Sequence, residues 1–170
     1  MTKKTNESGR TMLEMLGVLA IMGVIMYGAI AGISFGVEMY QINATYNQIE
    51  EISEGIVELY SWSRSYGDAD TNLAAEVCKN DITDCYSTGG VRSYLGGATV
   101  SVNVDSCSGD GCGKFKITYT GLSYLACTRL KDNAAAGGTG KQYRHVTCSV
   151  YPEDAECVSG NNNRLDCVSR

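Results

Sequence analysis

The sequence predicts an α+β protein in which a long N-terminal α-helix packs on a small antiparallel β-sheet rich in disulfide bonds. Three observations predict this fold. An apolar run near the N-terminus continues without a break into an amphipathic segment. Several segments of the second half alternate apolar and polar residues. All eight cysteines lie between Cys78 and Cys167. These patterns indicate a long helix, strands and a disulfide framework, respectively.

The apolar run carries no charged residue from Met15 to Val37. About 20 apolar residues in a helix span the hydrocarbon of a bilayer, so the run is long enough to do so. It is longer than the core of a secretory signal peptide and ends in no small-x-small cleavage site. Lys3 and Lys4 precede it, which favours a cytoplasmic N-terminus and an exported domain after the helix. We therefore expect residues 10–37 to be the transmembrane part of the helix.

From Glu38 the pattern becomes amphipathic, and one helix is expected from about Arg10 to about Trp62. Apolar residues spaced three or four apart mark the face that should pack on the sheet. They are Ile42, Tyr46, Ile49, Ile52, Ile56 and Leu59. The other faces carry Glu50, Glu51, Glu54 and Glu58. This acidic face is either solvated or meets basic groups of adjacent subunits. Residues 38–170 are expected to form the globular domain.

Alternating residues predict the strands of that domain. The predicted strands are 98–104, 114–120, 142–151 and 164–168. Short helices are expected at 73–77 and 122–130, and a loop at 131–141. Within the first predicted strand, Val100, Val102 and Val104 are expected to share one side. Within the second, Phe115, Ile117 and Tyr119 are expected to point inward.

The cysteines indicate disulfides and an oxidising compartment, because they are dense and even in number within a small domain. Zinc sites usually show closer paired spacings, often with histidine, and His145 is the chain's one histidine. Eight cysteines allow 105 pairings. Short loops favour Cys78–Cys85 and Cys107–Cys112. For the remaining four we favour Cys127–Cys157 and Cys148–Cys167.

Charge and motifs argue against several classes of function. Beyond residue 9 the chain has 12 Lys and Arg against 18 Asp and Glu, whereas nucleic-acid binding needs clustered basic charge. Neither Gly113-Lys114 nor Gly140-Lys141 satisfies a phosphate-loop pattern. His145 is expected to be a polar surface residue on a strand. We expect no catalytic residues, no metal and no cofactor, and hence no enzyme.

Ser8-Gly9-Arg10-Thr11-Met12-Leu13-Glu14, followed by the apolar run, resembles the processing site of type IV pilins and pseudopilins. The resemblance implies that residues 1–9 are a leader peptide. A prepilin peptidase would cut after Gly9 and methylate the new amine of Arg10. The family's glutamate at the fifth mature position falls on Glu14. The sequence departs from the family twice: Arg10 replaces the usual apolar first residue, and Ala31 stands where many members have proline.

Glu14 needs a compensating charge, because a carboxylate at the centre of a membrane helix costs roughly 2.5–3.5 kcal/mol. The free amine created at Arg10 would have a pKa near ~8 and carry a positive charge. In the family, the amine of one subunit pairs with this glutamate of a neighbour as the helices stack. Before assembly, Arg10 is expected to face lipid phosphates, although an Arg10–Glu14 pair within one chain is also possible. The alternative is that Glu14 merely caps the start of the helix.

Gly28, Gly32 and Gly36 form a ladder of small residues along the apolar run. Small residues at this spacing let membrane helices approach closely, so we expect these glycines to take part in subunit assembly. The alternative is that glycine is simply frequent in membrane helices.

The resemblance implies the type IV pilin fold and a structural subunit of an extracellular filament, with a type IVb-like major pilin favoured over a minor pilin or a type II secretion pseudopilin. Its partners would be further copies of the chain in a helical filament, the prepilin peptidase and the pilus assembly platform. The precursor would lie in the bacterial inner membrane and the mature protein in the pilus. An alternative is a monomeric, membrane-anchored, exported binding domain.

Overall fold

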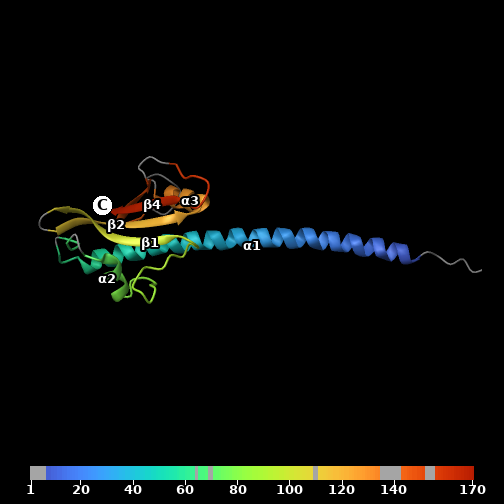
Figure 1. The fold of residues 1–170 in the computed structure, drawn as a ribbon, viewed down its shortest axis with the longest axis horizontal. Helices are drawn as coiled ribbons and strands as arrows, with labels where there is room; N and C mark the ends of the chain where they lie inside the picture. The colour runs from blue at the N-terminus through green and yellow to red at the C-terminus, as the bar shows by residue number, and fades with distance from the viewer. Residues whose placement is uncertain (1–6, 64, 69–70, 109–110, 135–142, 152–155) are drawn as a thin grey trace, which may run out of the picture. The chain divides into compact units, whose positions relative to one another are not determined.

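The computed structural model describes residues 7–63, 65–68, 71–108, 111–134, 143–151 and 156–170. In chain order its elements are α1 (Glu7–Leu59), α2 (Leu73–Lys79), β1 (Thr99–Ser108), β2 (Gly111–Leu122), α3 (Tyr124–Ala134), β3 (Val146–Tyr151) and β4 (Asn163–Ser169) (Figure 1). The prediction of an α+β protein with a long N-terminal helix, a small antiparallel sheet and disulfides is confirmed.

The chain divides into two compact units, residues 1–39 and residues 40–170. Helix α1 contributes to both, because it runs from Glu7 to Leu59. Its part in the first unit contains the uncharged apolar run Met15–Val37, whereas its part in the second unit, Tyr40–Leu59, carries the amphipathic pattern. All strands and both short helices belong to the second unit, which therefore contains the folded core.

The four strands form one antiparallel sheet in the order β1-β2-β4-β3. One row of paired residues crosses all four strands: Val102, Ile117, Cys167 and Cys148. Every member of this row is buried. Because side chains alternate between the faces of a strand, this row and the neighbouring buried residues Phe115 and Tyr119 define the inner face of the sheet. The inward orientation predicted for Phe115, Ile117 and Tyr119 is confirmed.

The second unit's part of α1 supplies the other side of the core. Five of the six predicted apolar positions are buried: Ile42, Tyr46, Ile49, Ile52 and Ile56. The sixth, Leu59, is 41% exposed, so its predicted burial is wrong. The helix ends at this residue. The backbone hydrogen bonds that follow are those of turns, such as the bond from Ser63 N–H to the carbonyl oxygen of Tyr60 at 2.9 Å. The helix was expected to reach Trp62, which is fully exposed and adds nothing to the core.

Gln48 is a fully buried polar side chain on α1. Its amide nitrogen donates to the carbonyl oxygen of Arg92 at 2.6 Å and to Oγ1 of Thr83 at 3.2 Å. Its amide oxygen accepts a hydrogen bond from the hydroxyl of Tyr119 on β2 at 3.0 Å. One side chain thus joins the helix to the sheet and to the segment between α2 and β1. A buried network of this kind stabilises when every member is satisfied.

All eight cysteines form disulfides. The pairs are Cys78–Cys85, Cys107–Cys112, Cys127–Cys157 and Cys148–Cys167, the same four that the sequence favoured. Two of them join residues that lie opposite each other on neighbouring strands, β1 with β2 and β3 with β4. Another ties α3 to the segment before β4. A disulfide that closes a loop of about 15 residues contributes about 3 kcal/mol in the loop-entropy model.

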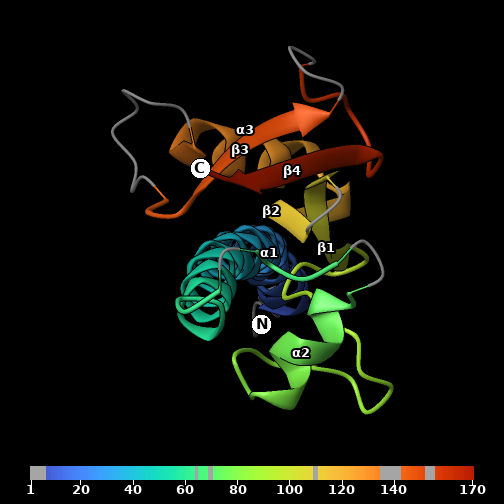
Figure 2. The ribbon, with the colours of Figure 1, turned by 90° about the vertical axis from the view of Figure 1, so that its left-hand side faces the viewer.

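Helix α3 lies against β3 and β4 (Figure 2). Ser123 caps its start, because its hydroxyl accepts a hydrogen bond from the backbone N–H of Ala126 at 3.2 Å. Just before this cap, Gly121 has a φ of 82° and lies at an irregularity in the β2–β4 pairing. Glycine adopts this left-handed conformation without strain, and the chain there leaves the strand for the helix.

Several predicted boundaries are wrong, although the elements exist. Residue 122 ends β2 instead of starting a helix, and α3 extends to Ala134, so the first four residues of the predicted loop are helical. The rest of that loop, from residue 135, lies outside the described residues. β3 begins at Val146 rather than residue 142, and His145 lies in a bend before it. Helix α1 begins at Glu7, before the expected Arg10.

The Gln48 network predicts a specific loss of stability. Gln48→Leu leaves the buried hydroxyl of Tyr119 and the carbonyl of Arg92 without partners, which costs about 2–4 kcal/mol. Urea unfolding of the full chain in mild detergent, followed by circular dichroism, measures this change. Asn47→Ala, at an exposed neighbouring position, should change the free energy of unfolding by less than about 0.5 kcal/mol. Adding Tyr119→Phe to Gln48→Leu should recover part of the loss; strict additivity would contradict the coupling.

Buried tyrosines give the second unit a pH dependence. Tyr46 and Tyr143 stack with ring centroids 4.6 Å apart. Burial raises the pKa of Tyr143, with further contributions from Tyr46 and Glu50. Burial also raises the pKa of Tyr119 well above its ordinary value. Ionisation of either phenol is therefore disfavoured in the folded state, since a charged group loses its hydration there.

We predict that stability is constant with respect to these tyrosines below about pH 10 and falls above it. In that range the unfolded chain loses protons that the folded chain retains, at up to about 1.4 kcal/mol per pH unit for each tyrosine. Tyr143→Phe should make the fall shallower, as measured by urea unfolding between pH 8 and about pH 11.5. Tyr124→Phe, which removes an exposed hydroxyl, is the control. An unchanged alkaline slope in Tyr143→Phe would contradict this assignment.

Candidate functional site

The first unit presents a continuous apolar surface along α1. From Met12 to Val37 every side chain of the helix is exposed. The large apolar ones number sixteen, with exposed fractions from 47% at Val18 to 78% at Tyr27. Soluble monomers rarely expose contiguous apolar patches larger than a few hundred Å². A surface of this kind indicates a membrane or a protein partner.

By length and composition α1 is able to cross a membrane. Its most apolar window has a mean hydropathy of 2.2, and none of that window is buried. A signal sequence near an N-terminus can meet the same criteria of length and composition. What distinguishes this helix is its continuation, without interruption, into the buried amphipathic part that begins at Tyr40. The apolar helix is thereby covalently continuous with a core element of the folded unit.

The glycines of the predicted ladder have no neighbours in the first unit. An added Cβ at Gly28, Gly32 or Gly36 would meet nothing within 4 Å beyond the helix's own backbone. Gly55, in the second unit, differs, because a Cβ there would come within 2.5 Å of the side chain of Ile82. Packing within the chain therefore explains Gly55 but does not explain the three ladder glycines, each of which weakens an isolated helix by up to about 1 kcal/mol relative to alanine.

Glu14 lies near the start of α1 with an exposed side chain. Gly9 and Arg10 lie in the first turn of the same helix. The side chain of Arg10 is outside the described part of the structure, and so are residues 1–6 of the predicted leader. An acid at the entrance of the apolar segment is thus observed, whereas its pairing with Arg10 stays a prediction.

The acidic face of α1 lies on the second unit. Glu51, Glu54 and Glu58 are exposed, and Glu50 is half-buried. Glu54 accepts a hydrogen bond from Arg144 at 3.2 Å, and both side chains are more than half exposed. Exposed ion pairs contribute little to stability. The described contacts of this face are those of a solvated helix surface.

The second unit shows no arrangement typical of catalysis among its described residues. There, no three or more His, Cys, Asp and Glu side chains group so that they could hold a metal ion. Each cysteine sulfur is bonded to another, which leaves no thiol as a nucleophile. His145 is half-buried in the bend before β3, and its backbone carbonyl oxygen accepts a hydrogen bond from Arg170 N–H at 3.1 Å.

The second unit also has a surface hollow that corresponds to no motif in the sequence. A hollow of about 250 Å³ lies between α3 and the segment at residues 156–157. Its lining comes from Tyr124, Thr128, Lys131, Asp132, Glu156 and Cys157. The helical spacing of Tyr124, Thr128 and Lys131 places them on one face, which is a signal available from the sequence. Their juxtaposition with Glu156 depends on the Cys127–Cys157 disulfide and was not predicted.

Comparison with known proteins gives no family for this chain: no family model matches it, and no curated protein matches it either.

Proposed function

We propose that this chain is a type IV pilin-like structural subunit. It is inserted in the membrane as a precursor, cut after Gly9 and assembled by packing of its N-terminal helices into an extracellular filament. The fold adopted is then that of type IV pilins, and the partners are other copies of the chain, the prepilin peptidase and the assembly platform. The proposal rests on the leader-like sequence around Gly9 together with the observations below.

The exposed apolar segment of α1 carries this proposal. Sixteen large apolar side chains between Met12 and Val37 are exposed, and burying each would gain about 1.5–3 kcal/mol. In a precursor the lipid chains cover this surface. In a filament the same surface is covered by the equivalent segments of neighbouring copies. One segment thus serves both states, because lipid tails and apolar side chains are similar environments.

Glu14 supports assembly over simple anchoring. A helix that only anchors the protein gains nothing from an acid at the start of its uncharged segment, since the charge opposes membrane insertion. Cleavage before Arg10 creates a cation that a neighbouring copy offers to this acid. In an apolar helix bundle such a pair fixes the axial register, because leaving either charge unpaired is costly.

The ladder glycines also support helix packing between copies. With nothing within 4 Å of an added Cβ, the described part of the chain gives no steric reason for Gly28, Gly32 or Gly36. Close approach of a second helix gives one, since small residues four apart let backbones come together. The globular unit would then be displayed outside the helix bundle, where its disulfides suit an oxidising exterior.

The first test concerns processing and assembly. Expressed with a prepilin peptidase and a pilus assembly platform, the protein should have a mature mass that starts at Arg10, with or without one methyl group. Surface material sheared from the cells should contain filaments of this chain by electron microscopy. An intact Met1 in membrane-bound monomers would instead support the monomeric binding domain and contradict the proposal. Processed protein without filaments of its own would favour a minor pilin or pseudopilin over a major pilin.

The second test isolates the charge. Glu14→Ala should leave membrane insertion intact, because it removes a charge from an apolar helix, and should abolish filaments, because the neighbour's amine loses its partner. Alkaline extraction of membranes measures insertion, and electron microscopy counts filaments. Glu51→Ala, which removes an exposed acid from the globular part of α1, is the matched control and should assemble. Normal filaments from Glu14→Ala would refute the role of the charge pair.

A further inference from the structure

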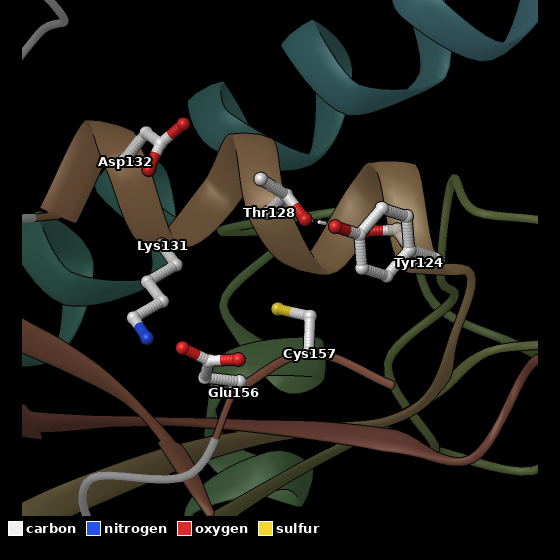
Figure 3. A pocket seen from close by; sticks show the side chains of 6 residues that line it. All are labelled: Tyr124, Thr128, Lys131, Asp132, Glu156 and Cys157. Carbon is white, nitrogen blue, oxygen red and sulfur yellow. Dashed lines mark hydrogen bonds between the residues drawn. The ribbon is translucent and has the colours of Figure 1, made fainter. Parts of the chain in front are cut away.

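The hollow beside α3 combines an aromatic ring with charges of both signs. Figure 3 shows Lys131 and Glu156 extending toward each other at one end, Tyr124 at the other, and the sulfur of Cys157 between them. Tyr124 is 53% exposed. Its ring is therefore available as an apolar surface at the mouth of a polar recess.

One disulfide and one pair of hydrogen bonds hold the walls of the hollow in place. The disulfide Cys127–Cys157 joins α3 directly to the opposite wall. Next to it, Val158 N donates to Oδ1 of Asn163 at 2.7 Å, and Nδ2 of Asn163 donates to the carbonyl oxygen of Val158 at 2.9 Å. The backbone of the two walls is thus held in place before any ligand arrives, and such preorganisation reduces the entropic cost of binding.

Asn163 also fixes the helix side of the hollow. Its side chain is buried, and Nδ2 donates to the carbonyl oxygen of Leu122 at 3.1 Å, immediately before the cap of α3. One asparagine therefore ties both walls to the start of β4. A buried amide with its polar atoms satisfied in this way makes a rigid support.

The polar groups of the hollow suit hydroxyl groups better than a net charge. Carboxylates accept hydrogen bonds and an ammonium group donates them, whereas a hydroxyl does both. Thr128 donates its hydroxyl hydrogen to the carbonyl oxygen of Tyr124 at 2.9 Å, which leaves its oxygen able to accept. Among the described lining residues, Lys131, Asp132 and Glu156 together carry one net negative charge, which disfavours an anion. An amine that approaches Glu156 meets the ammonium of Lys131 at the same end of the hollow.

We propose that this hollow binds one neutral sugar ring of a glycan. The sugar hydroxyls bond to Glu156 and Lys131, and the apolar C–H face of the ring packs on Tyr124, as aromatic side chains bury large apolar areas. The volume of about 250 Å³ is below the usual ~300–1,000 Å³ of small-molecule sites, which fits a single ring. All the residues belong to the second unit, so the site does not depend on filament assembly.

The experiment uses the full chain in a polyoxyethylene detergent, which has no sugar headgroup to compete. Saturation-transfer NMR is recorded with D-glucose, D-galactose and N-acetyl-D-glucosamine, each titrated separately, and with cadaverine as the amine probe. For a single ring in an open site we expect at least one sugar to bind with a Kd on the order of 1 mM.

Variants assign the binding to the hollow. Tyr124→Ala should weaken sugar binding by about fivefold or more, because the packing surface is lost, whereas Tyr124→Phe should retain it. Glu156→Gln should also weaken binding, because a charged acceptor becomes a neutral one. Tyr86→Ala, which removes an exposed tyrosine outside the hollow, is the matched control. Circular dichroism and the mass of the oxidised protein verify that each variant is folded with four disulfides.

Any one of three results would overturn the proposal. The first is that no sugar saturates the protein at concentrations up to about 50 mM. The second is sugar binding that is unchanged in Tyr124→Ala, and the third is binding of cadaverine in the absence of sugar binding. Sugar binding that falls in Tyr124→Ala and Glu156→Gln but not in Tyr86→Ala would support it. These results are independent of whether the protein forms filaments.

Discussion

The apolar surface of α1 between Met12 and Val37 is the constraint on which the rest of this protein depends. Burial of sixteen large apolar side chains is worth tens of kcal/mol by the usual transfer scale. A globular domain is stable by about 5–15 kcal/mol. Removing this surface from water is thus worth more than the net stability of the folded unit.

The second part of α1 also forms one face of the core of the globular unit. Because α1 is one continuous helix, its second part must supply a core face, and Ile42, Ile49 and Ile56 do so at helical spacing. A small sheet provides limited apolar area, and small domains of this kind are marginal without further constraints. Four disulfides and the Gln48 network supply those constraints. The chain thereby combines an exposed apolar helical segment with a disulfide-linked second unit.

The same links also shape the surface of the second unit. The Cys127–Cys157 bond joins the segment after residue 155 to α3, and Asn163 bonds to both Val158 and Leu122. The hollow lies between the two walls that these contacts connect. Stabilising links in a small domain can therefore also define a binding surface. In a filament, many copies of one weak site would act together, since linked sites raise the effective concentration of each other.

Local patterns in the sequence were sufficient for the elements that depend on periodicity. The long helix, the inward face of β2 and the short-loop disulfides follow from residues close together in the chain, where spacing alone sets which side chains share a face. The pattern around Gly9, on which the proposed processing rests, is likewise local. Tertiary structure decided the strand order β1-β2-β4-β3, the start of β3 at Val146, the three partners of Gln48 and the meeting of Tyr124 with Glu156. Each of these joins residues far apart in sequence, and such contacts depend on which apolar faces bury one another in the assembled core, for which periodicity carries no information.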